Sequence, residues 1–195
     1  RTSAYLALMD HYSQNKDYSR AVELGNLAKS ETTDSLSLTE INRQLYNYYF
    51  SSGDVKNGLK TVREMLSNLD ESQKELKAKL IFEFEIDMIG RSKDKDFREQ
   101  VKQEGFDALS FMKEAADTGY APAKELYFRM VVLNPKTSAE ESRQAMDYLV
   151  ESYFGYPFAF DDERLSGYSS MDEGHQELQY LESLVRLKEA DEEGL

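Results

Sequence analysis

The chain has no cysteine, no tryptophan and only three prolines among its 195 residues. The absence of cysteine excludes disulfide bonds, thiolate metal sites and a cysteine nucleophile, but it leaves the compartment open. Ten glycines and three prolines are too few for a collagen, a turn-rich β-sandwich or a disordered linker. The composition therefore predicts a globular and mainly helical protein.

Positive charge is also scarce. The 24 lysines and arginines stand against 37 aspartates and glutamates, and the net charge of −13 would repel phosphate groups. We therefore expect neither nucleic acid nor an anionic membrane among its partners. No apolar run approaches the roughly 18 residues of a membrane span, and no signal segment opens the chain. We expect a soluble protein without membrane insertion, and its start at Arg1 suggests a processed chain or part of a larger one.

Helix boundaries recur along the sequence. Capping boxes, in which a hydroxyl or carboxylate precedes a glutamate by three residues, predict starts at Ser37, Ser72, Asp96 and Ser138. Stops are predicted at Gly53, Gly90, Gly119 and Asn134-Pro135. The predicted helices are 3–15, 19–30, 38–52, 55–68, 72–89, 96–118, 121–133, 139–154 and 174–190.

One segment carries a competing pattern. Apolar and acidic residues alternate over residues 82–88, which is the period of a β-strand. Leu76, Leu80, Phe84 and Met88 also form a stripe at helical spacing, and no partner strand is visible elsewhere. Helix is therefore the preferred interpretation.

The first part of the chain repeats itself. When residues 4–24 and 42–62 are aligned by their turns rather than by their ends, each matched pair is 37 residues apart. The matched pairs are Leu8 with Leu45, Tyr12 with Tyr49, Asp17 with Asp54 and Ala21 with Gly58. A glycine inside a helix costs roughly 1 kcal/mol relative to alanine. Its place opposite Ala21 predicts that two helices approach too closely at Gly58 for a side chain.

These two units resemble tetratricopeptide repeats, which are helical hairpins of about 34 residues with small residues where the helices cross. The second half resembles the related Sel-like repeat. Its matching residues are Ala108, Phe111, Ala115, Ala116, Gly119 and Ala123. The resemblance implies an all-α, right-handed superhelix (solenoid) of about four to five antiparallel helix hairpins. We expect a single domain over 1–195, with tetratricopeptide-like units at 1–70, Sel-like units at 71–160, and a loop and C-terminal capping helix at 161–195.

The stretch AADTGYAPAKEL, residues 115–126, is interpreted as a junction between hairpins. Ala115 and Ala116 permit close packing of one helix on the next, and Gly119 is suited to a left-handed turn. Pro122 then falls in the first turn of the following helix, where its missing amide costs nothing. In the final helix, four apolar residues are expected to face inward: Leu178, Leu181, Leu184 and Val185.

Catalytic and metal-binding patterns are weak. His11 and His175 each lack a second ligand at metal spacing. Residues 167–171 begin like a nucleophile elbow without its closing glycine, and Asp161, Asp162 and Glu163 lack the spacing of a calcium loop. We assign no catalytic residue, cofactor or metal, and expect a protein that is not an enzyme. An all-helical enzyme using carboxylates is the least favoured alternative, since no particular pair is selected.

Two clusters suit contacts with other proteins. Basic residues gather at Arg91, Lys93, Lys95 and Arg98, either as a docking point for an acidic partner or as a solvated loop. Aromatic residues are dense in two places and favour an interface where they are not core. They are Tyr46, Tyr48, Tyr49 and Phe50, and then Tyr153, Phe154, Tyr156, Phe158 and Phe160.

The resemblance implies a concave face, lined by the first helix of each pair, that holds a peptide or protein segment. The positions that would face this groove are Leu6, Asp10, Gln14, Arg43, Asn47 and Phe50. Arg43 and Asn47 partly resemble a pair that grips a peptide carboxylate in some members, but Asp10 opposes such a clamp in the first unit. The leading hypothesis is a non-enzymatic interaction module that binds a protein or peptide partner. The alternative is a self-associating, homo-oligomeric domain of a larger protein.

Overall fold

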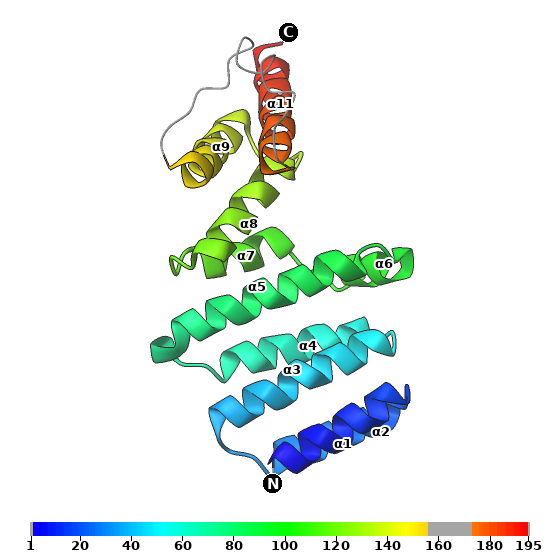
Figure 1. The fold of residues 1–195 in the computed structure, drawn as a ribbon. Coiled ribbons are helices and arrows are strands. Elements are labelled where there is room, and N and C mark those ends of the chain that lie inside the picture. Colours follow the sequence, from blue (N-terminus) through cyan, green and yellow to red (C-terminus); the bar gives the residue numbers. More distant parts are fainter. Residues whose placement is uncertain (1, 156–172, 195) are drawn as a thin grey trace. The chain divides into compact units, whose positions relative to one another are not determined.

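The computed structural model describes residues 2–155 and 173–194, and within these ranges every element is a helix and no strand is present (Figure 1). This confirms the all-α class. The chain divides into two compact units, Arg1–Ala108 and Leu109–Leu195, which we call unit 1 and unit 2. None of the described helices is both long enough and apolar enough to cross a bilayer. The single superhelical domain stays a prediction.

The helix bounds agree with most of the predicted ranges. Unit 1 contains α1 (Thr2–Gln14), α2 (Tyr18–Ser30), α3 (Ser35–Ser51), α4 (Val55–Ser67), the short 3-10 helix η1 (Glu71–Gln73), α5 (Lys74–Arg91) and α6 (Lys95–Gln103). Helix α7 (Ala108–Ala116) begins at the last residue of unit 1, and unit 2 also holds α8 (Ala121–Leu133), α9 (Ala139–Phe154) and α11 (Glu173–Glu193). The segment with strand-like alternation lies inside α5, so helix was the correct interpretation.

Two predictions about where helices stop are wrong. The single helix expected over 96–118 is broken into α6 and α7, because Gly105 adopts a left-handed φ of 64° that ends the first of them. Gly90 does not stop α5, which continues to Arg91. Gly90 is exposed and next to last in α5, and a helical glycine costs only about 1 kcal/mol relative to alanine, so the helix can include it.

Helix starts depend on aspartates that lie upstream of the predicted capping boxes. The carboxylates of Asp34, Asp70 and Asp94 accept backbone N–H groups at 2.8, 2.9 and 2.8 Å, so the starts predicted at Ser37, Ser72 and Asp96 are wrong by two or three residues. A carboxylate also interacts favourably with the positive end of the helix dipole. The capping box of Ser138 with Glu141 is confirmed.

Unit 1 opens with two antiparallel hairpins, α1 with α2 and α3 with α4, and α2 lies against α3 (Figure 1). The two turns match residue for residue at the 37-residue offset. Lys16 and Gly53 both have left-handed φ values, of 59° and 85°. The backbone dihedrals of Asp17 (φ −86°, ψ 65°) and Asp54 (φ −90°, ψ 73°) are nearly equal, and each carboxylate accepts the N–H three residues on. The repeat seen in the sequence is thus present in the backbone of both turns.

The close approach predicted at Gly58 is confirmed. A Cβ atom built on Gly58 of α4 would overlap the ring of Phe50 on α3. The ring of Phe50 is itself fixed by neighbouring rings, with centroids 5.7 Å away in Tyr46, 6.2 Å away in Phe84 and 5.4 Å away in Phe97. Helices α5 and α6 therefore pack on the second hairpin through this aromatic cluster.

Unit 2 is built from α8, α9 and α11, which contact one another around an apolar core. Leu178, Leu181 and Val185 are at most 2 % exposed and Leu184 is partly buried, as predicted for the final helix. At the junction before α8, Gly119 has a φ of 88° and Pro122 lies in the first turn of the helix, and both predictions are confirmed.

An ionic network ties α11 to α9. Arg143 on α9 donates hydrogen bonds to Glu182, which is 6 % exposed, and to Glu189 at 2.8 Å. The hydrogen bond from Arg143 holds the pKa of Glu189 below its ordinary value. Lys188 donates to the carbonyl oxygens of Val132 and Asn134 at 2.9 and 2.7 Å, which satisfies the C-terminal end of α8.

The matched turns generate a paired prediction. A lysine in the left-handed region is strained where a glycine is not, so Lys16→Gly should raise the free energy of unfolding by about 0.5–1 kcal/mol. Gly53→Lys should lower it by a similar amount. Urea denaturation followed by circular dichroism measures both, and a Lys16→Gly protein less stable than the parent would contradict the left-handed assignment.

Candidate functional site

A surface hollow of about 230 Å³ lies between α3 and α5 in unit 1. We call it the α3–α5 hollow. Each helix contributes residues spaced three or four apart, which places them on one face of that helix. The lining residues are Leu36, Thr39, Glu40 and Arg43 from α3, and Leu76, Lys79, Leu80 and Glu83 from α5.

One end of the α3–α5 hollow is apolar. Leu36 is 54 % exposed at the start of α3, Leu76 is partly exposed, and Leu80 is almost buried. The hydroxyl of Thr39 donates to the carbonyl of Ser35 at 2.8 Å, so its hydrogen is already used within the helix. This end can therefore bury an apolar side chain of a ligand without leaving the Thr39 hydroxyl without a hydrogen bond.

The other end leads into a row of paired charges across α3 and α5, which we call the polar row. Arg43 on α3 lies 3.3 Å from the carboxylate of Glu83 on α5. The amide oxygen of Asn47 accepts a hydrogen bond of 3.2 Å from Arg91, which also pairs with Asp87 at 2.8 Å. These contacts hold the two helices in register and give the hollow a fixed polar edge.

Arg43 and Asn47 do lie side by side, as their spacing predicts, but both already have partners within the chain. Arg43 is also 3.7 Å from Glu40, and the amide nitrogen of Asn47 donates to the carbonyl of Arg43 at 3.0 Å. A guanidinium shared between two carboxylates is a poor receptor for a third. The geometry therefore disfavours capture of a terminal carboxylate, in agreement with the sequence.

Phe50 does not lie on the surface. Its side chain is 5 % exposed and belongs to the aromatic cluster beneath the polar row, where the guanidinium of Arg91 lies 5.4 Å from its ring centroid. Placing Phe50 in a groove is therefore corrected, because the ring fills the space left by Gly58. Tyr46 and Tyr48 are also buried, at 5 % and 7 % exposed, so these aromatics serve the core.

The three predicted residues of the first helical repeat lie on α1 and do not line the α3–α5 hollow. Leu6 is partly buried and packs against the core of the first hairpin. Asp10 and Gln14 are exposed, and the Gln14 amide donates to the Asp10 carboxylate at 2.6 Å. They offer a small polar surface.

Sequence reasoning missed the contribution of α5. The sequence identifies Leu76 and Leu80 as part of a stripe on one helix, but it does not identify α3 as the helix beside them. Lys79 and Glu83 were not singled out. Because matching residues in a third unit could not be assigned, nothing in the sequence placed α5 beside α3.

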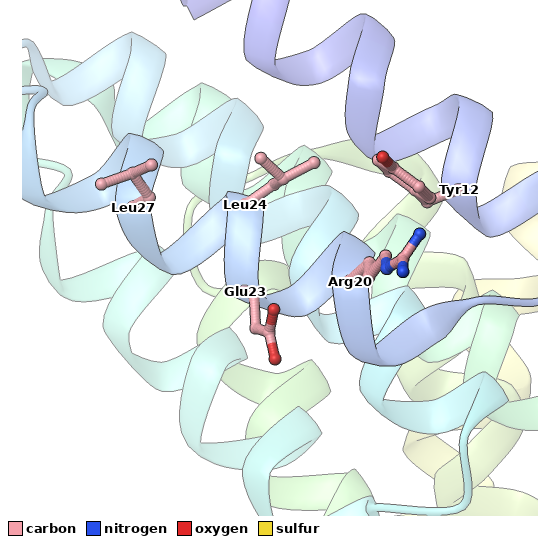
Figure 2. Close-up of a pocket in the computed structure, with 5 residues that line it drawn as sticks. All are labelled: Tyr12, Arg20, Glu23, Leu24 and Leu27. Atoms are coloured by element: carbon pink, nitrogen blue, oxygen red, sulfur yellow. The ribbon is translucent and has the colours of Figure 1, made fainter.

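A second hollow, of about 290 Å³, lies on the first hairpin and is shown in Figure 2. Its lining is Tyr12 from α1 and Arg20, Glu23, Leu24 and Leu27 from α2. The guanidinium of Arg20 lies 5.6 Å from the ring centroid of Tyr12. Leu27 is 47 % exposed, so apolar surface reaches solvent there.

Both histidines lie against aromatic rings, and the hydroxyl of Tyr153 lies 3.4 Å from Nδ1 of His175. His11 is exposed beside the ring of Tyr12, and His175 packs against Tyr153 and Phe154 with ring centroids 5.0 and 5.1 Å apart. Within residues 2–155 and 173–194, no three histidine, aspartate or glutamate side chains are grouped so as to hold a metal ion.

The predicted basic cluster is engaged in local structure. Arg98 donates to the carbonyl of Lys93 at 3.2 Å, and Lys95 lies 3.6 Å from Glu99. With Arg91 in the polar row, three of the four cations have partners within the chain. Several other predicted features lie outside the described residues: the acidic cluster 161–163, the segment 167–171, and Tyr156, Phe158 and Phe160.

Glu85 is the most strongly perturbed carboxyl group among the described residues of unit 1. It lies on α5 with 1 % exposure, and its Oε1 atom has no hydrogen-bond partner. Burial, together with the negative charge of Asp107, raises the pKa of Glu85 to about 8. Perturbed groups often mark active sites, but Glu85 lines neither hollow and is closed to a substrate.

Comparison of the chain with models of protein families, with curated proteins and with solved structures finds no match. The function must therefore be argued from the surfaces described above.

The buried carboxyl group predicts a pH dependence of stability. Because the pKa of Glu85 is higher in the folded state than in the unfolded chain, the folded protein binds the extra proton between about pH 4.5 and pH 8. The free energy of unfolding should fall across this interval by up to about 1.4 kcal/mol per pH unit and level off above it. Glu85→Gln should flatten the fall, as measured by urea denaturation at several pH values. Equal slopes for parent and variant would contradict the raised pKa.

Proposed function

We propose that the chain is a non-enzymatic interaction module that holds a peptide or protein segment on the face formed by α1, α3 and α5. The single observation that carries this proposal is the α3–α5 hollow, which has exposed leucine at one end and the polar row at the other. In protein interfaces, apolar side chains of this kind become buried on binding and are surrounded by a polar rim.

The shape of the α3–α5 hollow favours an extended segment. It lies on the surface between two helices, so it suits one apolar side chain of a longer ligand better than an enclosed small molecule. The polar row continues along the same two helices and offers hydrogen-bonding groups to the rest of such a segment. Its mixed charges would help to fix the position of the ligand, and they do not require a ligand of one sign.

The architecture that we propose around this face is an α-solenoid of the tetratricopeptide and Sel-like kind. The matched turns of the first two hairpins support it, as does the Gly119 and Pro122 junction. In such an arrangement α1, α3 and α5 are the first helices of successive pairs and present a common face.

A second candidate is self-association, supported by apolar side chains exposed on unit 2. Tyr180 and Leu187 on α11 are 58 % and 62 % exposed. Sedimentation at increasing protein concentration separates this candidate from a monomer that binds a foreign partner.

The proposed face is tested by two variants and one matched control. Leu36→Asp puts a charge at the apolar end of the α3–α5 hollow. The double change Arg43→Glu with Asn47→Ala reverses the charge at Arg43 and removes the Asn47 amide from the polar row. Because Leu36 and Arg43 are exposed, both proteins should keep their helicity. Loss of an anchor typically costs 2 kcal/mol or more, so binding of a partner captured by the parent chain should weaken at least about 30-fold.

Leu133→Asp is the control, since it makes the same change at a leucine of similar exposure in unit 2. It should bind the captured partner as the parent does. If all three variants retain the partner equally, the α3–α5 face is not the binding surface.

A further inference from the structure

Helix α2 packs against the hairpin that follows it, formed by α3 and α4. The side chain of Leu45 on α3 packs against Gly25, where a Cβ atom would overlap it. The hydroxyl of Tyr49 on α3 accepts from Asn26 at 3.4 Å, and Glu64 on α4 pairs with Lys29 at 2.5 Å. Leu45, Tyr49 and Glu64 are thus three positions at which the second hairpin contacts α2.

The first hairpin has the same three positions 37 residues earlier, where they are Leu8, Tyr12 and Leu27. The matched dihedral angles of the two turns make the correspondence structural. Leu45 is fully buried beneath α2, whereas Leu8 is 48 % exposed and Leu27 is 47 % exposed. The first hairpin therefore has a helix-receiving face with no described helix upon it.

The second hollow lies on this face. Figure 2 shows Leu24 and Leu27 on α2, with Tyr12 on α1 near Arg20. We define the outer face of the first hairpin as Leu8, Tyr12, Leu24 and Leu27. Tyr12, Leu24 and Leu27 line one hollow, and Leu8 lies one helical turn before Tyr12 on α1, so these residues form an apolar surface of a kind that marks interaction sites.

We infer that the outer face of the first hairpin binds an amphipathic helix of a partner protein, laid across it as α2 is laid across α3 and α4. The outer face repeats the positions that contact α2 on the second hairpin, so the way α2 packs there serves as the template for the bound helix. The occupant needs small residues at successive turns, as α2 has Ala21, Gly25 and Ala28, because these let a leucine and a tyrosine approach its backbone.

The template also fixes one difference in the partner's chemistry. On α4, Glu64 takes the positive charge of Lys29, but the corresponding residue on α2 is Leu27. The partner helix should therefore carry an apolar residue where α2 carries Lys29. A second copy of α2 is a poor occupant, because Ala21 and Ala28 are fully buried and Gly25 is in contact with Leu45 in its own chain.

The test uses a labelled synthetic peptide with the sequence of residues 17–31 and leucine in place of Lys29. Fluorescence anisotropy with the full chain should show saturable binding. Leu8→Asp or Leu27→Asp in the chain should weaken it at least about tenfold, the mark of one lost anchor. A peptide with Gly25→Leu should lose a similar factor, since it cannot approach closely.

Leu36→Asp is the matched control, because it adds the same charge at an exposed leucine that lies outside the outer face. It should leave peptide binding unchanged, and this separates the outer face from the α3–α5 hollow. If Leu8→Asp leaves peptide binding unchanged, the inference is wrong. That result is expected if the peptide displaces α2 from Leu45. The absence of saturable binding, or self-association of the chain that is abolished by Leu8→Asp, also overturns the inference.

Discussion

The fold of unit 1 depends on the contact between Gly58 and the ring of Phe50, where α3 and α4 lie too close for a side chain between them. Phe50 in turn packs against Phe84 of α5 and Phe97 of α6, so the spacing within one hairpin sets the position of the next two helices. The guanidinium of Arg91 rests over the same ring and reaches Asn47. The surface between α3 and α5 is thus supported directly by the core beneath it.

The contact between the two hairpins also depends on a small residue that packs against a large side chain. Gly25 on α2 receives Leu45 from α3, and the matched turns at Asp17 and Asp54 give both hairpins the same geometry. The first hairpin carries Leu8, Tyr12 and Leu27 at the positions through which the second hairpin contacts α2. The outer face of the first hairpin is a consequence of this repetition, whereas the α3–α5 hollow depends on the contacts between α3 and α5.

Most of the helices could be predicted from the sequence, because their period and turn residues are local properties. The break at Gly105 and the continuation through Gly90 could not, since one glycine ends a helix and the other does not, and the difference lies in the backbone. The site was predicted in part. Arg43 and Asn47 lie at its edge, but Phe50 is buried, because the space opened by Gly58 draws the ring inward. The role of α5 depends on contacts between distant segments, which spacing within one helix does not encode.

The most direct test of the account compares one substitution at two helical glycines by urea denaturation. Helix propensity alone predicts that Gly58→Ala and Gly90→Ala each stabilise the protein, by up to about 1 kcal/mol. Gly90 has no atom within 4 Å of a built Cβ, so Gly90→Ala should follow that expectation, whereas Gly58→Ala should lower the free energy of unfolding because Phe50 cannot move away. A Gly58→Ala protein as stable as Gly90→Ala would show that the close contact does not determine the fold.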